Sequence, residues 1–336
     1  MQQSTQSNGG PLGSHNARRA QEQTLSELLN LARRSPLGRS RGLGGVETHA
    51  GFRQRMPLVT DIELRVHPER CWLGVPEADS AAAGRRWKAA SRILCPLVGK
   101  IELQSDWLDL RDQLPAADAE RTKPFHQRLQ AMLNRMSGNA AKVIVAPTQW
   151  LCAVLGQLRA RGSSGTKPGS LGRVFPELRA VIAVASGFDG LLPLLHLQLS
   201  ETDRDLVVLG GYEAVPRGLV GIQGHPADER YVFLPDAGYF MEFISRGGES
   251  RLPLWELSKD QIYELCVSSS HGPVAYRTNR RLLCATTEPY RFVPCLSPAR
   301  SAAAPPCPTG RSDRERGRLI QLDNSPHWSP KDRFEC

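Results

Sequence analysis

The chain lacks the cysteine pairing that marks a metal site or a disulfide framework. Its eight cysteines are scattered, without a Cys-x-x-Cys motif and without a histidine at ligand spacing. We therefore expect neither a zinc site nor a set of disulfides. Cysteine usage of this kind favours a reducing, cytoplasmic location.

The sequence also has no apolar run of the roughly 18 residues that a membrane-crossing helix needs. Its first 13 residues are rich in Gln, Ser and Gly and contain no apolar segment of a secretory signal. We therefore expect neither a membrane span nor a secretory signal.

Positive charge exceeds negative charge, but not in the pattern of a nucleic-acid-binding surface. The formal net charge is +9, and much of the arginine excess lies toward the two ends, at residues 18–55 and 300–318. A basic balance attracts anionic partners such as nucleotides, nucleic acids or acidic lipids. Because no basic patch is interleaved with aromatic residues and no recognition motif is present, we do not expect a nucleic-acid partner.

Apolar strands and helical segments alternate in the middle of the chain. Residues 142–146 (KVIVA) predict a short strand, and the following segment predicts a helix that starts at Pro147 or Thr148. A further strand is predicted within residues 174–185 (VFPELRAVIAVA). Strands that alternate with helices indicate parallel βαβ units and an α/β fold.

The composition divides the chain into a core and two tails. Residues 1–22 predict a disordered tail, after which a helix is expected to begin with Thr24 as its N-cap. Residues 23–294 carry the periodic segments of one large domain. Residues 295–336 are of low complexity and predict a second tail.

Residues 231–244 (YVFLPDAGYFMEFI) are the most informative segment. They predict a short strand, a Pro-Asp turn and a second strand rich in aromatic and β-branched residues. The segments GGYEA (210–214) and GLVGIQ (218–223) precede them, and a strand, IYELCV (262–267), follows. Together these segments resemble the core of the auxin-responsive Gretchen Hagen family of acyl-acid amido synthetases. In that family, a Tyr-rich turn and a Gly-Ile-Asn/Gln strand precede a strand ending in Phe-Phe-Glu-Phe.

The resemblance covers about two-thirds of the chain and implies both a fold and an activity. The fold would be part of the large domain of an adenylate-forming enzyme, with mixed sheets, flanking helices and disordered ends. The activity would be that of an ATP-dependent acid–amino acid ligase that passes through an acyl-adenylate. Its cofactors would be ATP and magnesium, and its partners a small carboxylic acid and an amino acid.

Four residues would contact the nucleotide if the resemblance extends to the site. Tyr212 matches the tyrosine of the family's Tyr-x-x-Ser-Glu motif, and Gly221 would permit a close backbone approach. Tyr276 and Arg277 match a Tyr-Arg pair in the family's ribose-binding motif. Tyr276 would then lie near the base or the ribose.

The phosphate-binding loop of the family has no clear counterpart. Residues 80–88 (SAAAGRRWK) stand at its expected place without a Ser-Gly-Thr core. The segment SSGTK (163–167) has suitable residue types, but it follows a helix instead of a strand. We therefore interpret that segment as a flexible loop.

Two further motifs of the family are altered. Residues 215–217 replace its Ser-Glu pair, so the metal-binding glutamate has no direct counterpart, and Glu213 is expected to be a solvated turn carboxylate. Asn279 and Arg280 replace its Gly-Asp pair, and an arginine has only donors to offer a ribose hydroxyl.

These departures leave other interpretations open beside the ligase. An inactive relative would keep the fold and bind a partner or a small acid, and we also expect no counterpart of the smaller C-terminal domain of adenylating enzymes. A third interpretation is an imperfect gene model, in which mis-spliced or frame-shifted segments interrupt the motifs of an otherwise intact ligase. A basic nucleic-acid-binding protein ranks last.

Overall fold

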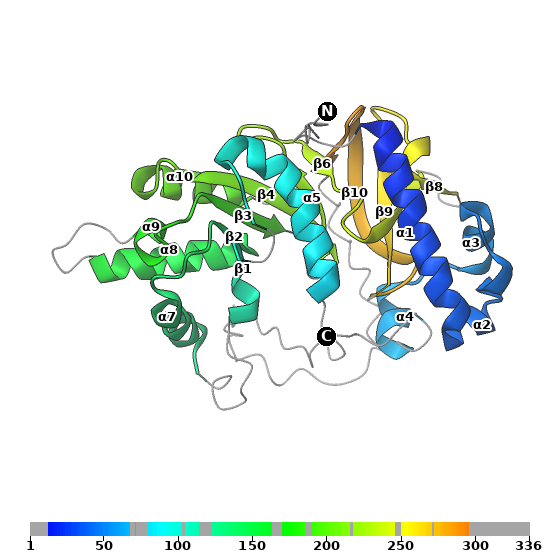
Figure 1. The fold of residues 1–336 in the computed structure, drawn as a ribbon, viewed down its shortest axis with the longest axis horizontal. Helices are drawn as coiled ribbons and strands as arrows, with labels where there is room; N and C mark the ends of the chain where they lie inside the picture. Colours follow the sequence, from blue (N-terminus) through cyan, green and yellow to red (C-terminus); the bar gives the residue numbers. More distant parts are fainter. Residues whose placement is uncertain are drawn as a thin grey trace, which may run out of the picture.

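The protein is a mixed α/β structure built on one large sheet. The structure, a computed structural model, describes residues 13–67, 71, 80–102, 105–113, 123–162, 170–185, 190–215, 218–245, 250–270 and 272–295. Its strands form an 11-stranded sheet in the order β1-β2-β3-β4-β5-β6-β11-β10-β9-β7-β8. Helices flank the sheet, as Figure 1 shows, so the predicted fold class is confirmed.

The bounds of the elements are as follows. The strands are β1 (Trp107–Asp109), β2 (Val143–Pro147), β3 (Ala180–Ala185), β4 (Val207–Val215), β5 (Gly218–Gln223), β6 (Tyr231–Phe233), β7 (Tyr239–Ser245), β8 (Arg251–Pro253), β9 (Ile262–Ser269), β10 (Tyr276–Thr287) and β11 (Tyr290–Pro294). The α-helices are α1 (Ser14–Arg34), α2 (Pro36–Ser40), α3 (His49–Arg55), α4 (Asp61–Val66), α5 (Ser80–Val98), α7 (Phe125–Met136), α8 (Thr148–Gly162), α9 (Leu171–Val174) and α10 (Leu192–Thr202). The 3₁₀ turns are η1 (Leu43–Gly45), η3 (Leu110–Gln113) and η4 (Leu254–Glu256).

Strands β1 to β4 form the parallel half of the sheet. β2 pairs with β3 in parallel register, with Val143 opposite Ala180, and β3 pairs in the same sense with β4. Helix α8 connects β2 to β3 and begins at Thr148. The predicted βαβ units and the predicted start of this helix are both confirmed.

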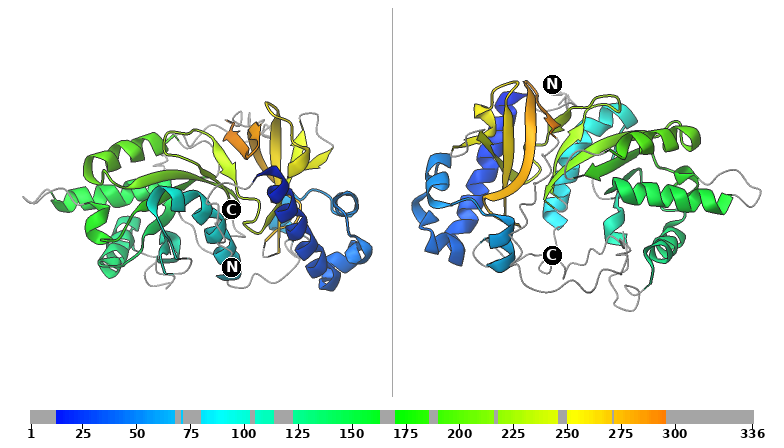
Figure 2. Two further views of the ribbon diagram at one scale, coloured as in Figure 1. Left: turned by 45° about the horizontal axis from the view of Figure 1, so that its top comes forward. Right: turned by 180° about the vertical axis from the view of Figure 1, so that it is seen from behind.

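β2 and β3, in the middle of the parallel half, are apolar throughout because helices cover both of their faces. Val143 and Val145 of β2 belong to the core that contains α5, whereas Ile144 and Ala146 pack with the helices α7 to α10. Successive side chains of a strand point to opposite faces, so a strand buried on both sides has no polar alternation. Figure 2 shows α7 to α10 gathered around the parallel half, away from α1 to α4, whereas α5 lies between the two groups and contacts α1 through Arg85 and Glu27.

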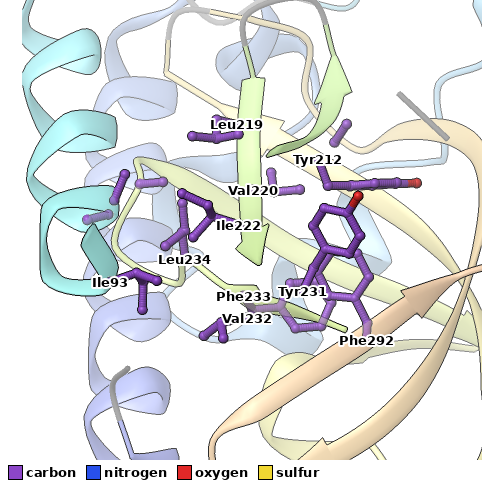
Figure 3. Packing of buried hydrophobic residues seen from close by; sticks show 14 of the residues in the cluster. Ile93, Tyr212, Leu219, Val220, Ile222, Tyr231, Val232, Phe233, Leu234 and Phe292 are labelled. Carbon is purple, nitrogen blue, oxygen red and sulfur yellow. The ribbon is translucent and has the colours of Figure 1, made fainter. Parts of the chain in front are cut away.

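Strands β5 to β11 form the antiparallel half, and aromatic side chains fill its core. Phe233 lies 4.2 Å from Phe292 between ring centroids, and Tyr231 stacks on Phe292 at 5.5 Å. Ile93 of α5 lies in the same cluster, as Figure 3 shows. The predicted strand–turn–strand over residues 231–244 corresponds to β6 and β7, and β9 contains the strand predicted at 262–267.

The first helix begins earlier than the sequence predicts. α1 starts at Ser14, so the expected start at Thr24 is wrong, and residues 14–22 of the expected tail are helical. The physical reason is tertiary packing, because Ala17 and Gln21 are buried against the sheet. Residues 1–12 and 296–336, which hold the rest of the two predicted tails, lie outside the described residues.

In the part of the chain that the structure describes, a helix long and apolar enough to cross a membrane was not found.

Hydrogen bonds of the Gln21 side chain connect α1 to the start of β7. Its amide nitrogen donates to the carbonyl oxygens of Pro235 and Tyr239, and its amide oxygen accepts from the backbone N–H of Met241 at 2.8 Å. The Gln21→Leu substitution leaves these buried groups without that partner. We expect the free energy of unfolding, measured in urea, to fall by at least about 2 kcal/mol. The exposed Gln23→Leu is the control, and an equal effect of both substitutions would contradict the role of Gln21.

His196 of α10 makes stability depend on pH. Burial lowers its pKa, and its Nε2 has no hydrogen-bond partner among the described residues. Because the unfolded chain takes up a proton at a higher pH than the folded chain, stability is full above the ordinary histidine pKa and falls as the pH drops toward the folded value. We expect His196→Gln to flatten the dependence of the unfolding free energy between about pH 7 and 5. An unchanged slope, equal to that of exposed His15→Gln, would refute this.

Candidate functional site

The carboxyl ends of the parallel strands come together at one edge of the sheet. Asp109 ends β1, Pro147 ends β2, and Ala185 ends β3 opposite Tyr212 of β4. Open α/β sheets bind ligands in the crevice outside these strand ends. In Figure 1 the strands run from α7–α10 toward the middle of the molecule, where α5 crosses. We refer to this region, with β4 up to Glu213, as the carboxyl edge.

Arg111 bridges two acids across the carboxyl edge. Its Nε and Nη2 donate to the carboxylate of Asp109 at 2.7 to 3.2 Å, and its Nη1 donates to both oxygens of Glu213 at 2.8 and 3.0 Å. The Asp109 carboxylate also accepts from the backbone N–H of Arg111 at 3.0 Å, which fixes the turn after β1. Arg111 therefore links β1 and β4, which are separated in the sheet by β2 and β3.

The charges of this cluster are buried. The Arg111, Asp109 and Glu213 side chains are only 13%, 7% and 11% exposed. Burial disfavours the charged guanidinium, but the attraction of Glu213 and Asp109 outweighs it and raises the pKa of Arg111. Burial raises the pKa of Glu213, while the charges of Arg111 and Arg86 act in the opposite direction. The attraction between the positive charge of Arg111 and the negative charges of Asp109 and Glu213 therefore holds the cluster together.

The expectation that Glu213 is a solvated turn carboxylate is wrong. β4 continues through Glu213 to Val215, so the residue lies in a strand, and the register with β5 shifts on both sides of it. Its carboxylate is turned to the carboxyl edge and paired with Arg111. Arg111 and Asp109 were not predicted as site residues. The Asp-x-Arg sequence directly after an apolar strand is the signal that marks them.

Tyr212 and Gly221 are brought together by the pairing of β4 and β5. Tyr212 is buried, which raises its pKa, and its ring centroid lies 5.1 Å from that of Phe292 (Figure 3). A Cβ atom on Gly221 would lie 2.6 Å from the Phe292 ring. The glycine is thus needed for the approach of this aromatic ring, whereas the sequence suggested the approach of a nucleotide.

Tyr276 and Arg277 lie at the start of β10 and already have protein partners. The Tyr276 hydroxyl donates to Asp61, and burial together with this carboxylate raises the pKa of Tyr276. Arg277 makes two 2.7 Å contacts with Glu264 of the adjacent strand β9. The backbone of Val59 bonds to Ala275 and Arg277 on either side of Tyr276, so the N-terminal segment holds this position.

The residues at the Gly-Asp position of the resembled motif form an irregular part of β10. Asn279 has φ 56°, and the register of β10 on β9 shifts between Arg277 and Arg280. Asparagine is one of the few residues that adopts this left-handed conformation readily. Burial raises the pKa of both Tyr212 and Tyr276, and the charge of Arg280, which stands in the place of the aspartate, acts against that rise.

The described residues do not form a magnesium site at the carboxyl edge. In the described ranges, a group of three or more His, Cys, Asp or Glu side chains able to hold a metal ion is absent. The carboxylates of Asp109 and Glu213 are both bound to Arg111. The loop SSGTK (163–167) lies outside the described residues, and residues 80–88 lie in α5, where Arg86 donates to the hydroxyl of Tyr239 at 3.2 Å.

Comparison with solved structures identifies the fold of this chain. No family model and no curated protein sequence matches the chain. Among solved structures, the AtGH3.15 acyl acid amido synthetase in complex with 2,4-DB is 15% identical, with a TM-score of 0.53, over 83% of this chain and 68% of its own. An open conformation of 2-hydroxyisobutyryl-CoA ligase in complex with 2-HIB-AMP and CoA is 13% identical, with a TM-score of 0.54, over 88% and 73%. The chain therefore has the fold of adenylate-forming ligases, shared by amido synthetases and CoA ligases alike.

Removal of Arg111 tests whether the buried cluster is held as described. Arg111→Met leaves two carboxylates buried without their cation, and we expect the free energy of unfolding to fall by about 3–5 kcal/mol. Arg230→Met removes an exposed cation from Asp228, which keeps its second cation, Arg291, and the variant serves as the control, for which little change is expected. If the two variants unfold at the same urea concentration, the cluster does not carry this part of the fold.

Proposed function

We propose that this protein is an adenylate-forming ligase of the acid–amino acid type, which activates a small carboxylic acid with ATP. The carboxyl edge supports this function, because it places Tyr212 and the Arg111 cluster where an open α/β sheet binds its ligand. The fold supports it as well, since one structural neighbour is an acyl acid amido synthetase and another was solved with an acyl-adenylate and CoA.

The residues of the chain divide into two roles in this proposal. The nucleotide lies at the carboxyl edge beside Tyr276, and the buried Tyr212 supports this edge from the core. Gly221 and Arg277 act indirectly. Gly221 lets Phe292 pack beneath Tyr212, and Arg277 ties β10 to β9 through Glu264. The chemistry that ATP supplies is an activated phosphoryl group for the acid, and an amino acid then accepts the acyl group.

Binding of a nucleotide and an acid without ligation is the second candidate function. Arg280 favours it, because a guanidinium has donors only and cannot accept a hydrogen bond from a ribose hydroxyl. The paired state of Glu213 favours it too, since this carboxylate is not available to a metal. Such a protein would bind its ligand and release no pyrophosphate.

A thermal melt and a pyrophosphate assay separate the two functions. We expect saturating ATP to raise the melting midpoint, with about 2.7 kcal/mol of added stability at a hundred times the dissociation constant. For the ligase, pyrophosphate is released when ATP is combined with carboxylic acids. For the binding protein, the midpoint rises without release. A midpoint unmoved by ATP, with no release, would contradict both.

Tyr276→Phe tests the position of the nucleotide. The variant keeps the ring and removes the hydroxyl that bonds to Asp61, so the start of β10 is less firmly held. We expect weaker ATP binding, read as a smaller midpoint shift at fixed ATP. Tyr290→Phe on β11 is the matched control, because that tyrosine lies away from the carboxyl edge, after the end of β10. Equal shifts in the two variants would remove Tyr276 from the site.

A further inference from the structure

We infer that Arg111 is the resident cation of the carboxyl edge, standing in for a divalent metal, so that nucleotide binds there independently of magnesium. This inference rests on the proposed function for its nucleotide, but the claim about the metal can be tested without one. It concerns the two carboxylates, Asp109 and Glu213, that would otherwise be the acidic ligands of this edge.

Arg111 already uses every oxygen of the two carboxylates. Both oxygens of Asp109 and both oxygens of Glu213 lie 2.7 to 3.2 Å from a guanidinium nitrogen. Magnesium takes oxygen ligands in near-octahedral geometry at about 2.0–2.1 Å and gives up its waters reluctantly. A metal between these acids would have to displace the guanidinium from the place it fills.

Displacement of the guanidinium is costly because Arg111 is buried. Removing one partner of a buried ion pair leaves an uncompensated charge in a low-dielectric site, which is strongly unfavourable. The side chain is 13% exposed, and the turn after β1 fixes its backbone through Asp109. Arg111 is therefore held at the carboxyl edge both by its side-chain contacts and by the turn after β1.

A second guanidinium reinforces this exclusion of metal. The charge of Arg86, on α5, acts on Glu213 in the same sense as that of Arg111. Arg86 is itself buried, and its Nη1 is bonded to Tyr239. A phosphate-bearing ligand therefore meets two carboxylates that are already paired with the Arg111 guanidinium and not a pair of bare acids.

The first experiment compares melts of the full chain with ATP in excess magnesium and with ATP in EDTA. We expect the same upward shift of the midpoint in both conditions. A shift that appears only with magnesium overturns the inference and leaves the proposed function standing. The absence of any shift in both conditions contradicts the proposed function, and the metal claim is then decided by the second experiment.

The second experiment uses manganese alone, followed by the loss of the free-ion electron paramagnetic resonance signal. The wild-type chain is compared with Asp109→Asn and Glu213→Gln, each checked for native circular dichroism. We expect one manganese isotherm for all three proteins. A binding site present in the wild type and lost in either variant overturns the inference, because it would show that these carboxylates hold a metal despite Arg111.

Discussion

The contacts of Arg111 with Asp109 and Glu213 link two strands of the sheet that share no backbone hydrogen bonds. β1 and β4 are separated by β2 and β3, so the ladder connects them only through those two strands. One guanidinium with five donors can hold two carboxylates at once. Tyr212 precedes Glu213 in β4, and the pairing of β4 with β3 and β5 sets its position beside this link.

Both halves of the sheet contribute residues to the candidate site. The parallel half, buried on both faces, supplies the rigid strands whose ends meet at the carboxyl edge. The antiparallel half supplies Tyr276 and Arg280 on an irregular part of β10. The antiparallel half joins the parallel half through the pairing of β5 with β4, and the aromatic cluster around Phe292 packs near this junction. A ligand at the edge would thus touch both halves.

The sequence predicted what depends on local pattern and missed what depends on distant contacts. The βαβ units followed from apolar runs and a Pro-Thr helix start, and β6, β7 and β9 followed from aromatic and β-branched residues. The start of α1 was missed because Gln21 owes its burial to β7, 220 residues away. The burial of Glu213 was missed for the same reason, since its partner Arg111 lies 102 residues earlier.

Residue type misleads most where the backbone conformation has to be known as well. Asn279 adopts a left-handed conformation at a position where the resemblance implies glycine, so a residue other than glycine does not exclude such a conformation. Gly221 shows the opposite case, a glycine that serves an aromatic ring of its own chain. Neither role can be read from one sequence without its neighbours in space.

The attachment of α1 to β7 sets the order in which the protein can form during synthesis. α1 is made first, but the backbone that Gln21 binds is made 220 residues later. At roughly 5–20 residues per second, a ribosome needs roughly 10–40 s to supply that partner. Over this interval the leucines of α1 can pack only against residues made shortly after them, such as Leu37, Leu43 and Phe52, and their contacts with Phe240 and Ile244 of β7 form later. The N-terminal helix therefore completes its native packing only after most of the sheet has been made.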